Sequence, residues 1–184
     1  RRPWKIALLP LSIPILWLNL VRESKSKNFK EIKVVSDPNN LAEGSRNCIV
    51  MFPTNGVGFG HFTRLLAIAR KLRKKDPTLE IVFFTTMPTL HILNDEKIVS
   101  YHMPGRYRYD NLEPSVWNSF AEEMLSLVFS LHRPKAFIFD GSYPYRGVLK
   151  SIKNRNHLLK IWVRRGVFKK NAKPIPSDSI NHFD

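Results

Sequence analysis

The chain has 184 residues, 43% of them hydrophobic, which is enough to build one globular core. Its formal net charge of +15 indicates anionic partners, namely phosphates, an acidic membrane surface or nucleic acid, with an inert basic surface as the alternative. The single cysteine, Cys48, excludes an internal disulfide framework and suits a reducing compartment. It lies in an apolar run, where we expect it to be buried.

Residues 1–22 combine an apolar run with basic residues on both sides. The run from Ile6 to Val21 is interrupted by Pro10 and Pro14 and is shorter than the roughly 20 apolar residues of a spanning helix, so we do not expect it to cross a bilayer alone. It fits either a segment that lies in the membrane interface or the end of a preceding domain. Because the sequence starts with Arg and has no recognisable terminal signal, we expect both ends to be cuts in a longer protein.

Residues 23–46 are polar and rich in turn-forming residues, so we interpret them as a linker with one short strand at 32–35. We expect the folded domain at 47–184. There, apolar runs alternate with segments of helical periodicity, which indicates an α/β domain with a Rossmann-like parallel sheet and helices on both faces. The expected strands are 48–52, 80–85, 98–102, 136–139 and 158–163, and the expected helices are 61–75, 89–93, 114–131 and 145–153.

The helix expected from Pro114 onward carries apolar residues at helical spacing, with Pro allowed in its first turn. We interpret these residues as core, because an amphipathic helix turns its apolar stripe toward the sheet. They are Trp117, Phe120, Ala121, Met124, Leu125, Val128 and Leu131.

The most informative stretch runs from Cys48 to Arg64 and reads CIVMFPTNGVGFGHFTR. A strand, a glycine-rich loop and a helix follow one another there. Glycine permits positive φ and close approach to a ligand, and a helix N-terminus attracts anions such as diphosphate. A dinucleotide fingerprint does not fit the G-x-G-x-G-H spacing, and a Walker loop does not fit because no Gly-Lys-Ser/Thr follows. The remaining alternative is a tight connection that binds nothing.

The order Gly58-x-Gly60-His61, followed by Thr63-Arg64, resembles the loop after the first strand of GT-B glycosyltransferases, in particular the group that includes the bacterial lipid II GlcNAc transferase. The resemblance implies the N-terminal, acceptor-side domain of a hexosyltransferase. Its donor would be a nucleotide-diphosphate sugar, most often UDP-linked, and its acceptor a lipid-linked or cell-envelope glycan. The donor-binding C-terminal domain would lie outside these residues, so the isolated chain is expected to be inactive.

His61 and Asp140 are the candidate catalytic residues. Imidazole titrates near neutrality, so His61 can take a proton from an acceptor hydroxyl, with capping or packing as the alternative role. Asp140 ends a strand and can orient the imidazole, with N-capping of the next helix as the alternative. The candidate substrate- and phosphate-binding residues are Asn55, Gly56, Gly58, Gly60, Arg64, Arg146, Arg164 and Arg165. For Arg164 and Arg165, phosphate and a structural carboxylate are both possible partners, with a solvated surface position as the alternative, and Arg64 and Arg146 are expected on the same basic rim.

The histidines show no metal-ligand spacing and no Asp-x-Asp is present, so we expect a metal-independent reaction with no cofactor beyond the donor. We expect the protein to be cytoplasmic and bound peripherally to the anionic inner face of the cytoplasmic membrane. A nucleic-acid partner is not expected, because the basic residues are dispersed. Two other functions stay open, a sugar-nucleotide epimerase of related fold and a non-catalytic basic module that binds nucleic acid or membrane.

Overall fold

The structure, a computed structural model, describes residues 45–54, 58–88, 90–106, 112–164 and 176–184. All of them lie in the second of the two units into which the chain divides, Asp37–Asp184. The segment expected at the membrane interface, 1–22, and the short strand expected at 32–35 fall outside these residues. Among the described helices, none has both the length and the apolar character that a bilayer-spanning helix requires.

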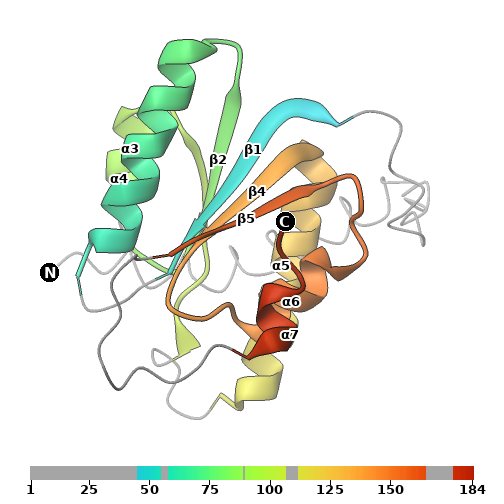
Figure 1. The fold of residues 1–184 in the computed structure, drawn as a ribbon. Coiled ribbons are helices and arrows are strands. Elements are labelled where there is room, and N and C mark those ends of the chain that lie inside the picture. Colours follow the sequence, from blue (N-terminus) through green and yellow to red (C-terminus); the bar gives the residue numbers. More distant parts are fainter. Residues whose placement is uncertain (1–44, 55–57, 89, 107–111, 165–175) are drawn as a thin grey trace, which may run out of the picture. The chain divides into compact units, whose positions relative to one another are not determined.

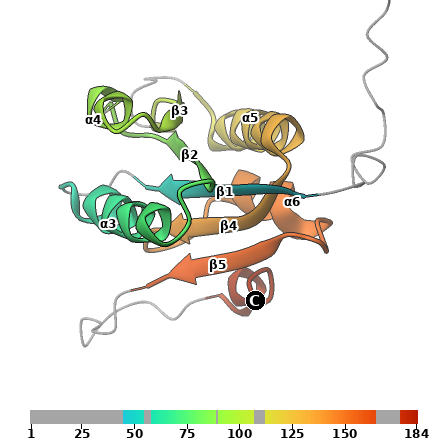
Figure 2. The same cartoon turned by 90° about the horizontal axis from the view of Figure 1, so that it is seen from above.

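The described strands form one five-stranded parallel sheet in the order β3-β2-β1-β4-β5 (Figure 1 and Figure 2). The strands are β1 (Arg46–Pro53), β2 (Glu80–Thr85), β3 (Val99–His102), β4 (Pro134–Asp140) and β5 (Leu159–Val163). The described helices are α3 (Gly60–Lys75), α4 (Leu90–Asp95), α5 (Pro114–His132), α6 (Arg146–Lys153) and α7 (Ser177–Ile180). The Rossmann-like α/β class is therefore confirmed, and only the single turn of α7 was not expected.

Helices cover both faces of the sheet, with α3 and α4 on one side and α5 and α6 on the other (Figure 2). Successive side chains of β1 alternate between these two layers because a strand has a period of two. Val50 and Phe52 belong to the core cluster that contains α5 and α6 residues, whereas Ile49 and Met51 belong to the cluster that contains α3 residues. A strand buried on both faces is apolar throughout, which is the pattern that the sequence showed.

The inward face of α5 is the expected one except at two positions, since Trp117, Ala121 and Val128 are buried. Leu125 is buried as expected, but Phe120 and Leu131 are 48% and 55% exposed, so the interpretation of these two residues as core was wrong. Contact with α6 fixes the rotation: the amide of Gly147 donates to Oδ1 of Asn118 at 2.8 Å, and a Cβ atom at position 147 would lie 2.1 Å from the Asn118 carbonyl oxygen. Because α5 carries apolar residues around more than one face, periodicity alone does not select the inward one.

The order of the strands reverses between β1 and β4. From β1 the chain continues through α3 to β2 on one side of the sheet, and from β4 it continues through α6 to β5 on the other. Loops that leave a reversal point for opposite faces diverge, and this is where α/β sheets bind ligands. In the register of the two strands Pro53 pairs with Asp140, so the glycine loop after β1 starts beside the end of β4.

Candidate active site at the carboxyl ends of β1 and β4

His61, Arg64 and Asp140 meet at the reversal point of the sheet. Nδ1 of His61 lies 2.7 Å from Oδ1 of Asp140. Nε of Arg64 donates to Oδ2 of Asp140 at 2.6 Å, and Nη2 of Arg64 donates to Oδ1 at 2.8 Å. The Asp140 side chain is 1% exposed, compared with 14% for His61 and 33% for Arg64. The structure thus joins the two predicted catalytic side chains within hydrogen-bond distance.

Capping does not account for the positions of His61 and Asp140. The N-cap of α3 is Phe59, and His61 lies inside the first turn of the helix with its ring directed at Asp140. The N-cap of α6 is Tyr145, which leaves Asp140 as the last residue of β4 with no capping contact. Both side chains are therefore held by each other and by Arg64 rather than by helix termini.

The backbone around Asp140 is also fixed. Its carbonyl oxygen accepts hydrogen bonds from the amide of Thr54 at 2.9 Å and from Oγ1 of Thr54 at 3.2 Å. The carbonyl of Gly141 accepts from Nε1 of Trp162 at 2.9 Å. A Cβ atom at Gly141 would lie 2.7 Å from side-chain atoms of Thr54, so only glycine fits this close approach. The Asp140 carboxylate is therefore presented from a backbone that is tied to both neighbouring strands.

The hydrogen bond to Asp140 determines which nitrogen of His61 is available. A carboxylate only accepts hydrogen bonds, so the 2.7 Å contact with Asp140 places a proton on Nδ1 of His61; Nη2 of Arg64, which lies 3.2 Å from the same nitrogen and can only donate, then makes no hydrogen bond to it. Nε2 then has the free lone pair of the neutral ring. An imidazole held in this way can take up a proton at Nε2 while the carboxylate stabilises the resulting cation.

Arg64 is placed differently from the expectation of a phosphate-binding residue. Two of its donors are directed at the Asp140 carboxylate, and this hydrogen bonding raises the pKa of Arg64 above its ordinary value. It lies three positions after His61 on α3, and residues three apart project from the same side of a helix. In the structure the partner of Arg64 is therefore the Asp140 carboxylate.

The other predicted binding residues lie along the same edge of the sheet where they are described. Gly58 has φ of +99°, a conformation that requires glycine, and Gly60 is the first residue of α3. Arg146 is exposed at the start of α6, and the guanidinium of Arg164 lies 4.9 Å from the ring centre of Trp162. The remaining three, Asn55, Gly56 and Arg165, fall outside the described residues.

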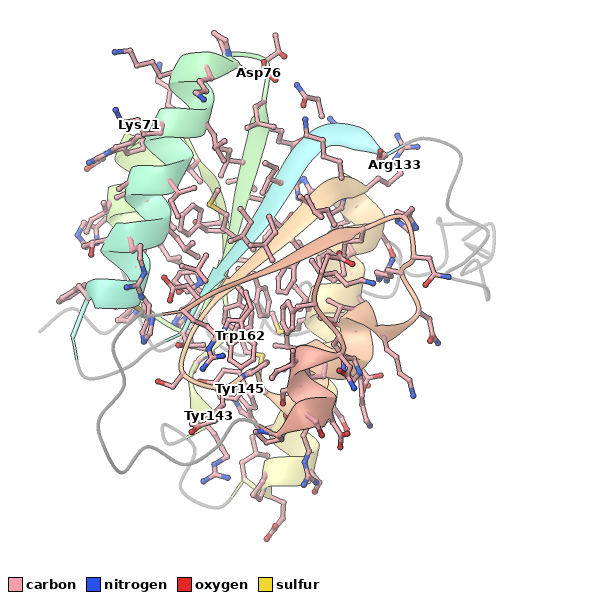
Figure 3. The ribbon with its side chains drawn as sticks, in the orientation of Figure 1. Lys71, Asp76, Arg133, Tyr143, Tyr145 and Trp162 are labelled. Atoms are coloured by element: carbon pink, nitrogen blue, oxygen red, sulfur yellow. The ribbon has the colours of Figure 1, made fainter. Side chains whose placement is uncertain are left out.

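Exposed aromatic side chains accompany the site, and the sequence reasoning did not single them out. Phe59 is 55% exposed at the start of α3, and Tyr143 is 43% exposed in the loop after β4. Figure 3 shows Tyr143 and Tyr145 at this end of the sheet, whereas Asp76 and Arg133 mark the opposite end. The sequence signal for them was an aromatic residue within each of the polar loops that follow β1 and β4.

A second polar cluster lies away from this edge, at the C-terminal end of α5. Atoms of Cys48, Glu80 and His132 that could ligate a metal lie within 4.8 Å of one another, the one such group among the described residues. Hydrogen bonds already occupy both nitrogens of His132, with Glu80 Oε1 at 2.6 Å and the Tyr101 hydroxyl at 2.8 Å. These bonds tie the last residue of α5 to β2 and β3, so we assign the cluster a structural role. Its residues are far apart in sequence, which is why spacing did not reveal them.

Comparison with known proteins gives a likeness of fold. No family model matches the chain, and no curated protein matches it. Among solved structures, a glycosyltransferase from Rickettsia africae ESF-5 is similar over 71% of this chain and 31% of its own, with 14% identity and a TM-score of 0.54.

MurG from Acinetobacter baumannii is similar over 62% of this chain and 34% of its own, with 17% identity and a TM-score of 0.48. A UGT transferase from Siraitia grosvenorii, solved in complex with UDP, is similar over 62% of this chain and 24% of its own, with 13% identity and a TM-score of 0.37. This chain therefore spans about a third of the Rickettsia and Acinetobacter proteins. Its described residues have a GT-B glycosyltransferase-like fold, the fold that the resemblance of the glycine loop implied.

Proposed function

We propose that this chain is the acceptor-side part of a glycosyltransferase that moves a sugar from a nucleotide-diphosphate sugar, with uridine as the expected nucleoside, to an acceptor hydroxyl. The observation that carries the proposal is the pair of His61 and Asp140 at the reversal point of a GT-B-like sheet, with Nδ1 and Oδ1 2.7 Å apart. A buried carboxylate hydrogen bonded to one nitrogen of an imidazole, with the other nitrogen available, is an arrangement that suits a histidine general base.

In the proposed reaction the acceptor hydroxyl oxygen attacks the anomeric carbon of the donor sugar. The new carbon–oxygen bond forms as the bond from that carbon to the diphosphate oxygen breaks, and the nucleoside diphosphate leaves with the bonding electrons. Nε2 of His61 takes the hydroxyl proton, and Asp140, fixed at Nδ1, stabilises the imidazolium. No redox partner and no cofactor beyond the donor enter this balance.

The residues around the pair support a phosphate-bearing substrate. Gly58 has φ of +99° and open space around its Cα, so a ligand could come close to the backbone there, and the first turn of α3 offers amide groups and the positive end of the helix dipole to an anion. Arg146 and Arg164 add positive charge along this edge. We further propose a lipid-linked or cell-envelope glycan acceptor and action at the inner face of the cytoplasmic membrane, supported by the net charge of +15 and the apolar, basic-flanked residues 1–22.

The proposal predicts that His61→Ala lowers the rate of sugar transfer by about 10²- to 10⁴-fold, the usual contribution of a general base. The measurement is release of nucleoside diphosphate by the full-length protein, with a panel of nucleotide sugars and membrane lipid extract. His91→Ala is the matched control, because His91 is exposed on α4 and takes no part in the pair. A His61 variant that keeps wild-type activity would contradict the proposed base.

The same assay separates the proposal from the functions that the sequence left open. Sugar conversion without any acceptor would identify an epimerase. If no donor is turned over and the protein instead binds nucleic acid with a strong dependence on salt, a basic binding module replaces the transferase.

A further inference from the structure

The Asp140 carboxylate carries a charge in a place that water hardly reaches. Its side chain is 1% exposed, and a buried carboxylate is unfavourable unless the charge is paired and hydrogen bonded. A neutral His61 supplies one hydrogen bond but no positive charge. Arg64 supplies both, so among the side chains that the structure bonds to this carboxylate it is the permanent cation.

The geometry of Arg64 also orients the carboxylate. Nε binds Oδ2 and Nη2 binds Oδ1, which is a two-point contact along one edge of the guanidinium. Two parallel hydrogen bonds define the rotation of the carboxylate plane, whereas a single bond leaves it free. With the plane fixed, Oδ1 is shared between Arg64 and Nδ1 of His61, and Nη2 of Arg64 lies 3.2 Å from that same nitrogen.

The positive charge of Arg64 affects how many protons the His61 ring carries. With Arg64 present, the negative charge of Asp140 is already balanced, and the ring needs to donate only the hydrogen at Nδ1. Without Arg64, the same buried carboxylate would be balanced most readily by a second proton on the ring, which occupies Nε2. A ring that is protonated at both nitrogens donates at both and can no longer accept a proton.

We propose that Arg64 is a positioning residue of the His61–Asp140 pair, which balances and orients the Asp140 carboxylate so that His61 stays neutral with Nε2 free. This inference rests on the proposed function for its catalytic meaning. It replaces the interpretation of Arg64 as a phosphate ligand.

The first experiment observes the ring nitrogens of His61 directly, by NMR of the 184-residue chain labelled with ¹⁵N-histidine, near neutral pH. His61→Gln identifies the His61 signals among the six histidines. Wild type is expected to show a proton on Nδ1 and a bare Nε2. Arg64→Gln is expected to shift His61 toward the doubly protonated ring, whereas Arg64→Lys, which keeps the charge, is expected to keep the wild-type pattern.

Arg70→Gln is the matched control, because it removes the same charge from an exposed position of α3, where Arg70 pairs with Glu96. His61 signals in Arg64→Gln that equal those of wild type would overturn the proposal. The same holds if Arg64→Lys and Arg64→Gln change the ring alike, since the positive charge would then not be the property that matters. Signals of the other histidines report whether each variant is folded.

The second experiment measures the kinetics of the full-length protein. A positioning residue predicts that Arg64→Gln lowers kcat and leaves the KM for the nucleotide sugar unchanged, with Arg64→Lys recovering part of the rate. A raised KM with unchanged kcat would assign Arg64 to the donor phosphate and overturn the proposal. Because the ring spectra need no sugar transfer, a failure of the proposed glycosyltransferase activity and a failure of this inference would appear in separate measurements.

Discussion

Burial controls the chemistry of Cys48. The thiol lies in β1 with no exposed surface, and this burial raises its pKa to about 12, with the nearby Glu80 carboxylate acting in the same direction. The thiolate is the reactive form of cysteine, so a high pKa makes the side chain inert. The residue therefore serves the core as a small apolar group, as the sequence analysis expected.

We predict that Cys48 reacts with a thiol reagent such as DTNB very slowly in the folded protein. At pH 8 its thiolate fraction should be about a thousandfold below that of an ordinary cysteine, since its pKa of about 12 replaces an ordinary value of 9.0. Addition of urea should release the reactive thiol together with the loss of helical circular dichroism. Rapid labelling of the native protein would show that the β1 core opens far more often than its packing implies.

The close packing of α5 against α6 depends on the absence of a side chain at Gly147. At Gly147 a Cβ atom would lie 2.1 Å from the backbone oxygen of Asn118 and 3.1 Å from Cβ of Ala121. The first of these neighbours belongs to the backbone of a long helix and cannot turn away. The two helices can therefore approach this closely only while position 147 carries glycine.

Gly147→Ala is accordingly predicted to destabilise the domain by about 1–3 kcal/mol, the usual cost of overpacking a core. Gly105→Ala is the matched control, because its Cβ atom would have Thr86 Cβ at 4.0 Å as its nearest neighbour. The measurement is urea unfolding followed by circular dichroism, with the midpoints of both variants compared with wild type. Equal midpoints for wild type and Gly147→Ala would mean that α6 can slide along α5 without cost.

Across the whole molecule, stability should be graded from the middle of the sheet to its edges. The residues of β1 from Cys48 onward and the last five of β2 are buried, whereas β3 and β5 have exposed or partly exposed residues throughout. We predict that amide hydrogen exchange is slowest in β1, β2 and β4 and faster in β3 and β5, because protection follows buried, doubly flanked strands. Amides of β3 as slow as those of β1 would indicate that a further element covers that edge.

The sequence predicted the central strands well, because a strand buried on both faces must be apolar along its whole length, as Cys48 to Phe52 is. The meeting of His61 and Asp140 was also foreseeable, since both follow strands whose carboxyl ends share one edge. The direction of Arg64 was not, because an arginine in a first helical turn can face solvent, phosphate or a strand. The direction of the Arg64 side chain depends on where β4 lies relative to α3, and the pairing of β1 with β4 determines that position.

The same pairing has a consequence for how the molecule folds. His61 and Asp140 are 79 positions apart, and the register that joins them is that of β1 with β4. Between these two strands the described part of the sequence contains α3, β2, α4, β3 and α5. During synthesis from the N-terminus, the residues of α3 are made before Asp140, the residue that His61 and Arg64 of α3 contact. Contacts of such long range form slowly, because the loop between them must first be closed. Formation of the His61–Asp140 contact therefore reports completion of the central sheet, and no fragment that lacks either β1 or β4 can assemble it.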